Sequence, residues 1–299
     1  MRVACIGECM VELTLPREGQ PGDPRVGFAG DTANVAVYLK RTAPEIEVAY
    51  VTALGTDPLS RQMTGFLASE GLDIGLIETR EDRVPGLYAI SVDASGERSF
   101  TYWRESSAAR TLFLPPAAVT PERLAGFDLV YLSGITLAIM APEARAALAA
   151  FLPDYRAGGG RVAFDSNYRP RLWPDRATAQ REIDAFWALT DIGLPSVDDE
   201  MALTGADEAG VVARLAGLGV RRGALKRGPG GPRPLGPVGA LPAFLPAARV
   251  VDTTAAGDSF NGAYLATVLR GAPEAECLAA GHACAAQVIG YPGAIIPRV

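Results

Sequence analysis

The sequence predicts an α/β fold in which helices cover both faces of a mainly parallel sheet and a small β-sheet forms a lid. Apolar runs of strand length alternate with amphipathic helical stretches, and this alternation is typical of βαβ units. One stretch interrupts the alternation with the pattern of an antiparallel hairpin. The chain has 299 residues, of which 48% are hydrophobic and 21% charged, and this composition supplies enough apolar material for a large core.

The predicted elements follow one another along the chain. Apolar runs predict strands at 3–7, 47–54, 129–133, 161–165, 192–194 and 223–226. Amphipathic periodicity predicts helices at 33–40, 58–70, 142–151, 178–189 and 207–218. Asp31 and Thr32 precede the first of these helices and form a suitable N-cap.

The interrupting hairpin is expected at 88–92 and 98–104, with its turn at 93–96. An antiparallel flap inserted into a parallel α/β protein favours a lid over a site. Residues 16–30 contain too many glycines and prolines for a helix, and 227–242 is a surface loop for the same reason. Since no long linker or internal repeat divides the chain, we expect a single domain, 1–299, with a lid from about 11–30 and 85–105.

Composition excludes several classes of protein. The formal net charge of -6 argues against a general nucleic-acid binder. Residues 1–15 lack the apolar core of a signal peptide, and no window holds the ~18 uninterrupted apolar residues of a membrane span. No Cys-x-x-Cys pair occurs, which favours free thiols in a reducing cytosol; the cysteines are Cys5, Cys9, Cys277 and Cys284. We therefore expect a cytoplasmic protein without nucleic-acid or membrane partners.

The segment Asp-Thr-Thr-Ala-Ala-Gly-Asp at 252–258 follows an apolar run that ends at 251. It predicts a strand, a tight turn and the start of a helix, where free backbone N–H groups and the helix dipole bind anions. Ala255, Ala256 and Gly257 have side chains small enough for a phosphate to approach the backbone. Asp258, in the first turn, can accept the proton of an attacking hydroxyl. Taken alone, the pattern also fits a capped helix with small residues for packing.

Other phosphate-binding motifs are absent from the sequence. There is no Gly-x-x-x-x-Gly-Lys-Ser/Thr, which excludes a P-loop kinase. No Gly-x-Gly-x-x-Gly follows a strand, which excludes a dinucleotide-dependent oxidoreductase.

The heptapeptide 252–258 resembles the C-terminal signature of the ribokinase-like (PfkB family) sugar kinases, and 30–36 resembles their N-terminal sugar-binding signature. Ala255 stands where many members have glycine, and Ala29 replaces another usual glycine. The resemblance covers essentially the whole chain and is greatest for the branch that acts on 2-dehydro-3-deoxygluconate. The further matching blocks are 6–13, 50–57, 85–88, 102–104, 131–135, 164–173 and 290–298.

The resemblance implies a three-layer α/β/α sandwich with a small β-sheet lid, and a carbohydrate kinase that uses ATP and Mg²⁺. It implies that Asp258 is the catalytic base and that the backbone at Ala255, Ala256 and Gly257 forms the anion hole. The residues it assigns to the sugar are Gly30, Asp31, Asn34, Tyr88, Tyr102, Arg104 and Arg169. Those it assigns to the nucleotide are Ser196, Lys226, Gly228 and Gly257. Ser196 and Asp199 replace the family's Asn-x-x-Glu, so Asp199 is a candidate for an indirect magnesium contact.

Arg104 and Arg169 are also chemically suited to bind the carboxylate of an acidic sugar, because a guanidinium can donate two parallel hydrogen bonds to a carboxylate. The alternative for Arg169 is a surface ion pair in a solvated loop. Tyr88 and Tyr102 would lie on one face of the hairpin and contact the sugar, or else only pack across the strands. Trp103 would point to the opposite face, as an interface or core residue.

These observations favour ATP-dependent phosphorylation of 2-dehydro-3-deoxy-D-gluconate at its 6-hydroxyl. The alternatives are a fructokinase or another ribokinase-like sugar kinase, and a non-catalytic sugar-acid sensor. By analogy with the family, we expect a homodimer through the lid or a higher homo-oligomer. Selectivity between gluconate and galactonate epimers stays open.

Overall fold

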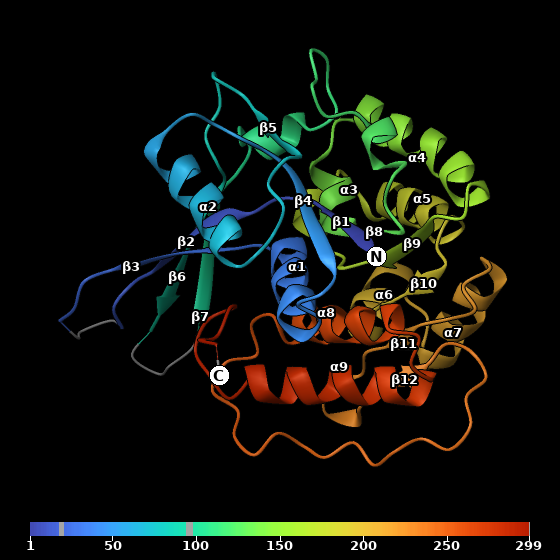
Figure 1. The fold of residues 1–299 in the computed structure, drawn as a ribbon. Helices are drawn as coiled ribbons and strands as arrows, with labels where there is room; N and C mark the ends of the chain where they lie inside the picture. The colour runs from blue at the N-terminus through green and yellow to red at the C-terminus, as the bar shows by residue number, and fades with distance from the viewer. Residues whose placement is uncertain (18–20, 94–97, 299) are drawn as a thin grey trace.

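A six-stranded parallel sheet runs through the centre of the molecule in the computed structural model, which describes residues 1–17, 21–93 and 98–298 (Figure 1). Its strand order is β10-β9-β8-β1-β4-β5, and each neighbouring pair is parallel. The strands are β1 (Arg2–Ile6), β4 (Glu47–Leu54), β5 (Ile77–Thr79), β8 (Leu129–Ser133), β9 (Arg161–Asp165) and β10 (Ile192–Gly193). All but β5 lie where the apolar runs predict strands.

Helices cover both faces of this sheet and complete three layers. Alternate residues of β1 serve opposite faces, because Ala4 and Ile6 join one apolar core while Val3 and Cys5 join the other. The first core is closed by α3 (Gly134–Ile139), α4 (Pro142–Ala157), α5 (Arg176–Trp187), α6 (Val197–Thr204) and α7 (Glu208–Gly217). The second is closed by α1 (Asp31–Thr42), α2 (Pro58–Ser69), α8 (Ala256–Leu269) and α9 (Glu274–Val288).

A separate four-stranded sheet projects from one side of the core, at the left of Figure 1. Its order is β3-β2-β6-β7, and the strands are β2 (Met10–Thr14), β3 (Arg25–Ala29), β6 (Leu87–Val92) and β7 (Arg98–Trp103). The predicted hairpin is confirmed, since β6 and β7 are antiparallel and Tyr88 pairs with Tyr102. Its turn was expected at 93–96, of which 94–96 lie outside the described residues.

The predicted strand before the heptapeptide 252–258 is wrong. The chain from 241 to 252 has no regular structure, and Val250 is 63% exposed. The backbone N–H groups of Val251 and Asp252 both donate to the carbonyl of Ile289, at 2.7 and 3.1 Å. This segment is therefore held by the end of α9 rather than by a neighbouring strand.

Three further details differ from the sequence-based expectations. Gly30, not Asp31 or Thr32, is the N-cap of α1, because the Asp31 carboxylate accepts hydrogen bonds from residues outside its own helix. Helix α4 continues to Ala157 and accommodates Pro153 in its interior. The Gly/Pro-rich segment contains β12 (Arg233–Pro234), which pairs antiparallel with β11 (Ala224–Leu225).

Within the described ranges, no helix has the length and apolar character needed to cross a membrane.

Candidate active site

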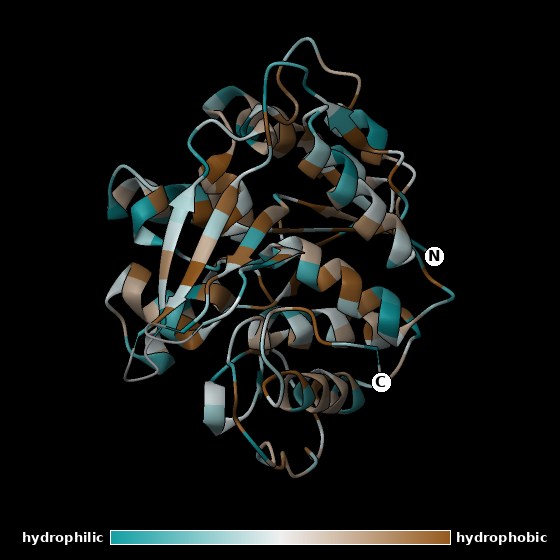
Figure 2. Cartoon of the chain, turned by 90° about the vertical axis from the view of Figure 1, so that its left-hand side faces the viewer, coloured by the Kyte–Doolittle hydropathy of each residue, from teal (hydrophilic) through white to brown (hydrophobic). Residues whose placement is uncertain are grey.

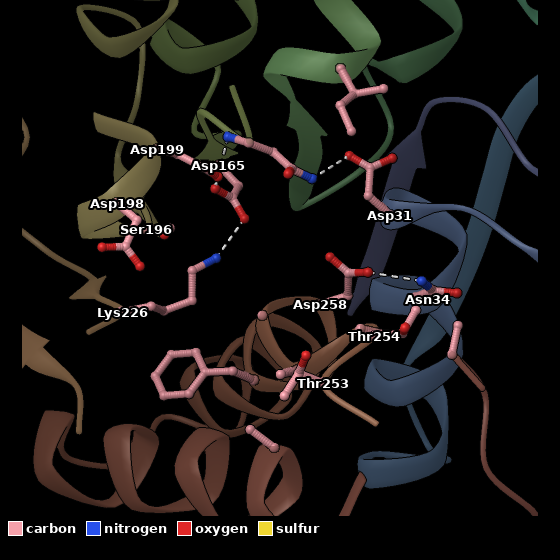
Figure 3. A pocket seen from close by; sticks show the side chains of 18 of the residues that line it. Asp31, Asn34, Asp165, Ser196, Asp198, Asp199, Lys226, Thr253, Thr254 and Asp258 are labelled. Carbon is pink, nitrogen blue, oxygen red and sulfur yellow. Dashed lines mark hydrogen bonds and ion pairs between the residues drawn. The ribbon is translucent and has the colours of Figure 1, made fainter. Parts of the chain in front are cut away.

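A cavity of about 1480 Å³ lies between the carboxyl ends of the central strands, the small sheet and the N-terminus of α8. The carboxyl end of a parallel sheet is the usual position of a ligand site in α/β proteins. Every residue predicted to bind a substrate, to form the anion hole or to act as the base lines this cavity, and so does Asp199. These residues are Gly30, Asp31, Asn34, Tyr88, Tyr102, Arg104, Arg169, Ser196, Asp199, Lys226, Gly228, Ala255, Ala256, Gly257 and Asp258. Figure 3 shows several of them converging from different elements.

The N-terminus of α8 faces this cavity. Ala255 is its N-cap residue in the left-handed conformation, with φ 59° and ψ 16°. Within the described chain, no side chain caps this helix end. A Cβ added at Gly257 would lie 3.5 Å from the ammonium of Lys226, so the glycine leaves the backbone open beside a cation. Uncapped N–H groups next to a positive charge form an anion-binding site.

Asp258 projects from the first turn of α8 into the cavity (Figure 3). Its Oδ2 accepts a hydrogen bond of 2.8 Å from Nδ2 of Asn34 on α1. Burial in the cavity wall, aided by the nearby carboxylate of Asp31, raises the pKa of Asp258 to about 7, while the Asn34 bond opposes the rise. A carboxyl group with this pKa can exchange a proton near neutral pH.

Asp31 anchors the start of α1 to the ends of two central strands. Its Oδ2 accepts hydrogen bonds from the hydroxyl of Ser133, at the end of β8, and from Nδ2 of Asn167, at 3.0 Å. A Cβ at Gly30 would lie 2.1 Å from the carbonyl oxygen of Glu8, so only glycine allows α1 to begin this close to the chain that follows β1.

Lys226 is the centre of a polar cluster opposite Asp258. Its ammonium lies 2.5 Å from Oδ2 of Asp165 and 3.1 Å from Oδ1 of Asn261, and Asn261 also donates to Asp165 at 2.8 Å. Sequence reasoning missed both partners of this lysine. Asp165 ends a parallel strand and Asn261 lies three residues after Asp258 on the same helix, and these two positions were the signals that could have identified them.

Arg169 and Asp199 form an ion pair of 2.9 Å on the cavity wall. The Arg169 side chain is 48% exposed, so the predicted alternative of a surface ion pair is present in the structure. Ser196 lies at the N-cap of α6, and Gly228 begins a short 3-10 turn, Gly228–Gly230, in the loop after β11.

The tyrosines of the small sheet pack on one another as the hairpin register requires. The ring centroids of Tyr88 and Tyr102 are 5.8 Å apart, and the Tyr88 hydroxyl donates to Glu12 of β2. Cross-strand packing is thus present, and both rings also line the cavity. Trp103 is 56% exposed, so of the two predicted roles the core position is wrong.

An ion pair that the sequence did not reveal links the small sheet to the loop before α8. Arg98, at the start of β7, pairs with Oδ1 of the buried Asp252 and lies 3.4 Å from the hydroxyl of Thr254. The same carboxylate accepts the backbone N–H of Thr254 at 2.9 Å and that of Gly293 at 2.6 Å. Asp252 therefore connects β7, the loop before α8 and the segment around Gly293, which are far apart in the sequence.

Comparison with known structures identifies the class of protein that this fold and cavity define. The PfkB protein from Polaromonas sp. JS666 superposes with a TM-score of 0.83 at 25% identity, over 96% of this chain and 94% of that one. The architecture is thus that of the ribokinase-like kinases.

Sequence comparison then gives the family. The model of the pfkB family carbohydrate kinases matches residues 1–299, and the chain belongs to this family. It is 43% identical over 305 residues to the 2-dehydro-3-deoxygluconokinase of Escherichia coli (strain K12), covering 99% of this chain and 97% of that protein. It is 45% identical to the 2-dehydro-3-deoxygluconokinase of Dickeya dadantii (strain 3937), over 99% of this chain and 96% of that protein.

Proposed function

We propose that this protein transfers the γ-phosphoryl group of ATP to the 6-hydroxyl of 2-dehydro-3-deoxy-D-gluconate. The observation that carries the proposal is Asp258, a carboxyl group with a pKa of about 7 in the first turn of α8, beside uncapped backbone N–H groups. The two relatives that are 43% and 45% identical bear the name of this activity.

The groups at the N-terminus of α8 and the ammonium of Lys226 would carry out the phosphoryl transfer. Asp258 takes the proton of the attacking hydroxyl. The backbone at 255–258 donates to the oxygens of the moving phosphoryl group, where charge develops in the transition state. Lys226 adds a positive charge beside Gly257, and Asp165 and Asn261 hold its ammonium in place.

The remaining residues divide between the two substrates. Arg104 and Arg169 provide guanidinium groups for the carboxylate of the sugar acid, and Gly30, Asp31, Asn34, Tyr88 and Tyr102 surround its chain. We assign Ser196, Lys226 and Gly228, which also line the cavity, to the nucleotide. The small sheet, which carries Tyr88 and Tyr102, acts as the lid that excludes water from the reaction.

The donor set of the cavity fits magnesium bound through the nucleotide. In residues 1–17, 21–93 and 98–298, no three His, Cys, Asp or Glu side chains cluster as a metal site. Mg²⁺ commonly keeps several waters and uses few carboxylates together with substrate phosphates, and it neutralises phosphate charge. Asp199, whose carboxylate is 22% exposed on the cavity wall, is the side chain we assign to it, through water.

The test is a coupled assay of ATP turnover with 2-dehydro-3-deoxy-D-gluconate and with fructose. We expect turnover of the sugar acid, and a loss of about 10²- to 10⁴-fold in kcat for Asp258→Asn with a small change in KM. Asp207→Asn, which keeps a good N-cap of α7 outside the cavity, is the control. Preferential turnover of fructose would indicate a fructokinase, and no turnover of any sugar would indicate a sensor.

We also propose that the protein is a cytoplasmic homodimer joined through the small sheet. Trp103 pairs with Leu87, and Leu87 pairs with Val11 of β2. Leu13 lies two residues further along β2, on the same face as Val11, and pairs with Val26. Trp103 and Val26 therefore share the face opposite Tyr88 and are 56% and 55% exposed. Figure 2 turns the left-hand side of the molecule toward the viewer and shows apolar residues along the strands of the small sheet. Such exposure favours a partner surface.

A further inference from the structure

A buried ion pair between Glu8 and Arg104 lies in the cavity wall at the sugar end. Glu8 follows β1 and is 1% exposed, and Arg104 follows β7 and is 6% exposed. One terminal nitrogen of Arg104 donates to Oε2 of Glu8, and both residues line the cavity. In the part of the chain that the structure describes, Oε1 of Glu8 and Nε of Arg104 have no hydrogen-bond partner.

The space beside these two atoms depends on a glycine. A Cβ at Gly86 would lie 2.6 Å from Oε1 of Glu8 and 3.2 Å from Cβ of Arg104, so any other residue at 86 would press on the pair. Burial raises the pKa of Glu8, while the charge of Arg104 and the nearby hydroxyl of Ser107 oppose the rise. The Ser107 hydroxyl is itself buried without a hydrogen bond to a described residue. Among the described residues, the Ser107 hydroxyl is therefore the group that could bond to Oε1 of Glu8 in place of a ligand.

The chemistry of the unpartnered atoms defines what can satisfy them. Nearly all buried polar atoms in proteins have a hydrogen-bond partner, so a ligand is the expected partner for those that face a cavity. An ionised carboxylate oxygen only accepts, and a guanidinium N–H only donates. A ligand that satisfies both atoms must present a donor next to an acceptor. A sugar acid does so with a hydroxyl and its carboxylate.

We propose that Glu8 is a specificity-determining residue that accepts a hydrogen bond from a hydroxyl of the sugar acid, while it holds Arg104 toward the carboxylate. This inference rests on the proposed function, and it identifies which hydroxyl of the sugar acid bonds to Glu8. The 6-hydroxyl faces Asp258, and carbon 3 carries no hydroxyl. The hydroxyl nearest the carboxylate end of the open chain is therefore that of carbon 4. This hydroxyl donates the hydrogen bond to Glu8.

The test compares 2-dehydro-3-deoxy-D-gluconate with its 4-deoxy analogue in the wild type and in Glu8→Gln. Glutamine has the same shape, but it turns an amide N–H₂ toward the hydroxyl when its oxygen faces Arg104, so the hydroxyl becomes the acceptor of a weaker bond between neutral groups. We expect the wild type to prefer the parent substrate by about 10- to 100-fold in kcat/KM, the range of a hydrogen bond to a charged group. In Glu8→Gln this preference falls to about 2- to 10-fold, the range of a bond between neutral groups, while KM for ATP is unchanged.

Two control variants separate this role from a structural one. Glu70→Gln also breaks a buried ion pair, with Arg41 at 2.8 Å, but Glu70 does not line the cavity, and we expect the full preference in this variant. Ser107→Ala removes the rival partner, and it too should keep the preference. The inference is overturned if Glu8→Gln slows both substrates equally, or if Ser107→Ala abolishes the preference.

A measurement on the wild type alone covers the case in which Glu8→Gln does not fold. The parent sugar acid should raise the Tm of the protein more than the 4-deoxy analogue does at equal concentration. Equal protection by the two compounds would overturn the role of Glu8. If the wild type neither binds nor phosphorylates the parent compound, the proposed function itself is wrong. If it phosphorylates the parent compound and the 4-deoxy analogue equally well, only the role of Glu8 is wrong.

Discussion

At Asp258, which we propose as the catalytic base, activity and stability require opposite protonation states. As a base it must be ionised, but its surroundings raise its pKa from the ordinary value of 3.8 to about 7. A carboxyl group whose pKa is raised by folding contributes full stability below its unfolded pKa and loses it as pH rises through the folded pKa. Between about pH 4 and pH 7, therefore, ionisation of this group costs stability while it generates the active form.

The pH dependence of kcat/KM should follow this ionisation. We expect kcat/KM for the sugar acid to rise with pH, with an apparent pKa of about 7, and to level off above it. Asn34→Ala removes a hydrogen bond that lowers the pKa of Asp258, so its profile should shift to higher pH. The measurement is a set of initial rates between pH 5.5 and 9. A profile that is flat over this range would show that Asp258 is not the titrating base.

At the scale of elements, the active geometry depends on how closely α1 and α8 approach. Asn34 and Asp258 lie on these two helices, and Gly262 stands at their contact. A Cβ at 262 would lie 2.8 Å from the backbone nitrogen of Leu39 and 2.8 Å from the carbonyl oxygen of Val35. Backbone atoms cannot move aside as a flexible side chain does, so the helices must separate if residue 262 is enlarged.

Gly262→Ala should therefore lower both stability and activity. We expect a loss of about 1–3 kcal/mol in the free energy of unfolding, the usual cost of overpacking a core, and a lower kcat because Asn34 moves away from Asp258. Urea denaturation and the coupled assay measure the two effects. Gly217→Ala at the end of α7 is the matched control, since nothing lies within 4 Å of its Cβ, and it should leave both unchanged or be slightly stabilising. A fully stable Gly262→Ala variant would contradict the expectation.

At the scale of the whole molecule, the proposed homodimer through the small sheet predicts a specific assembly state. We expect light scattering after size exclusion to give twice the chain mass of 31.3 kDa for the wild type. Trp103→Lys should give a monomer, because it places a charge on the exposed apolar face of the sheet. Met201→Lys, on an exposed position of α6, should stay dimeric. A monomeric wild type, or a dimeric Trp103→Lys variant, would refute assembly through this face.

Much of the architecture could be predicted because its determinants are local. The buried runs of β4 and β9 and the periodicity of α2 and α7 specify their elements without distant contacts. The apolar run before Asp252 failed as a predictor because two backbone bonds to Ile289 fix that segment instead of a strand partner.

The site residues divide in the same way. The cluster at 255–258 could be predicted because a turn and the following helix start define it locally. Asp165 and Asn261 could have been identified from their positions at a strand end and on α8, but Glu8 and Arg98 could not, because each acts through a partner that is far away in the sequence. Glu8 meets Arg104 across 96 residues, and Arg98 meets Asp252 across 154. No local pattern contains such a pairing.

The contact between Arg98 and Asp252 has a consequence for the way the two substrates are bound. Arg98 joins the small sheet to the loop that leads into α8. We expect a sugar that draws the proposed lid inward to move this loop as well. We therefore expect binding in one half of the cavity to change the affinity of the other half, and thermodynamic reciprocity makes such an effect equal in both directions. The signature is synergy, in which the dissociation constant of either substrate falls once the other is in place.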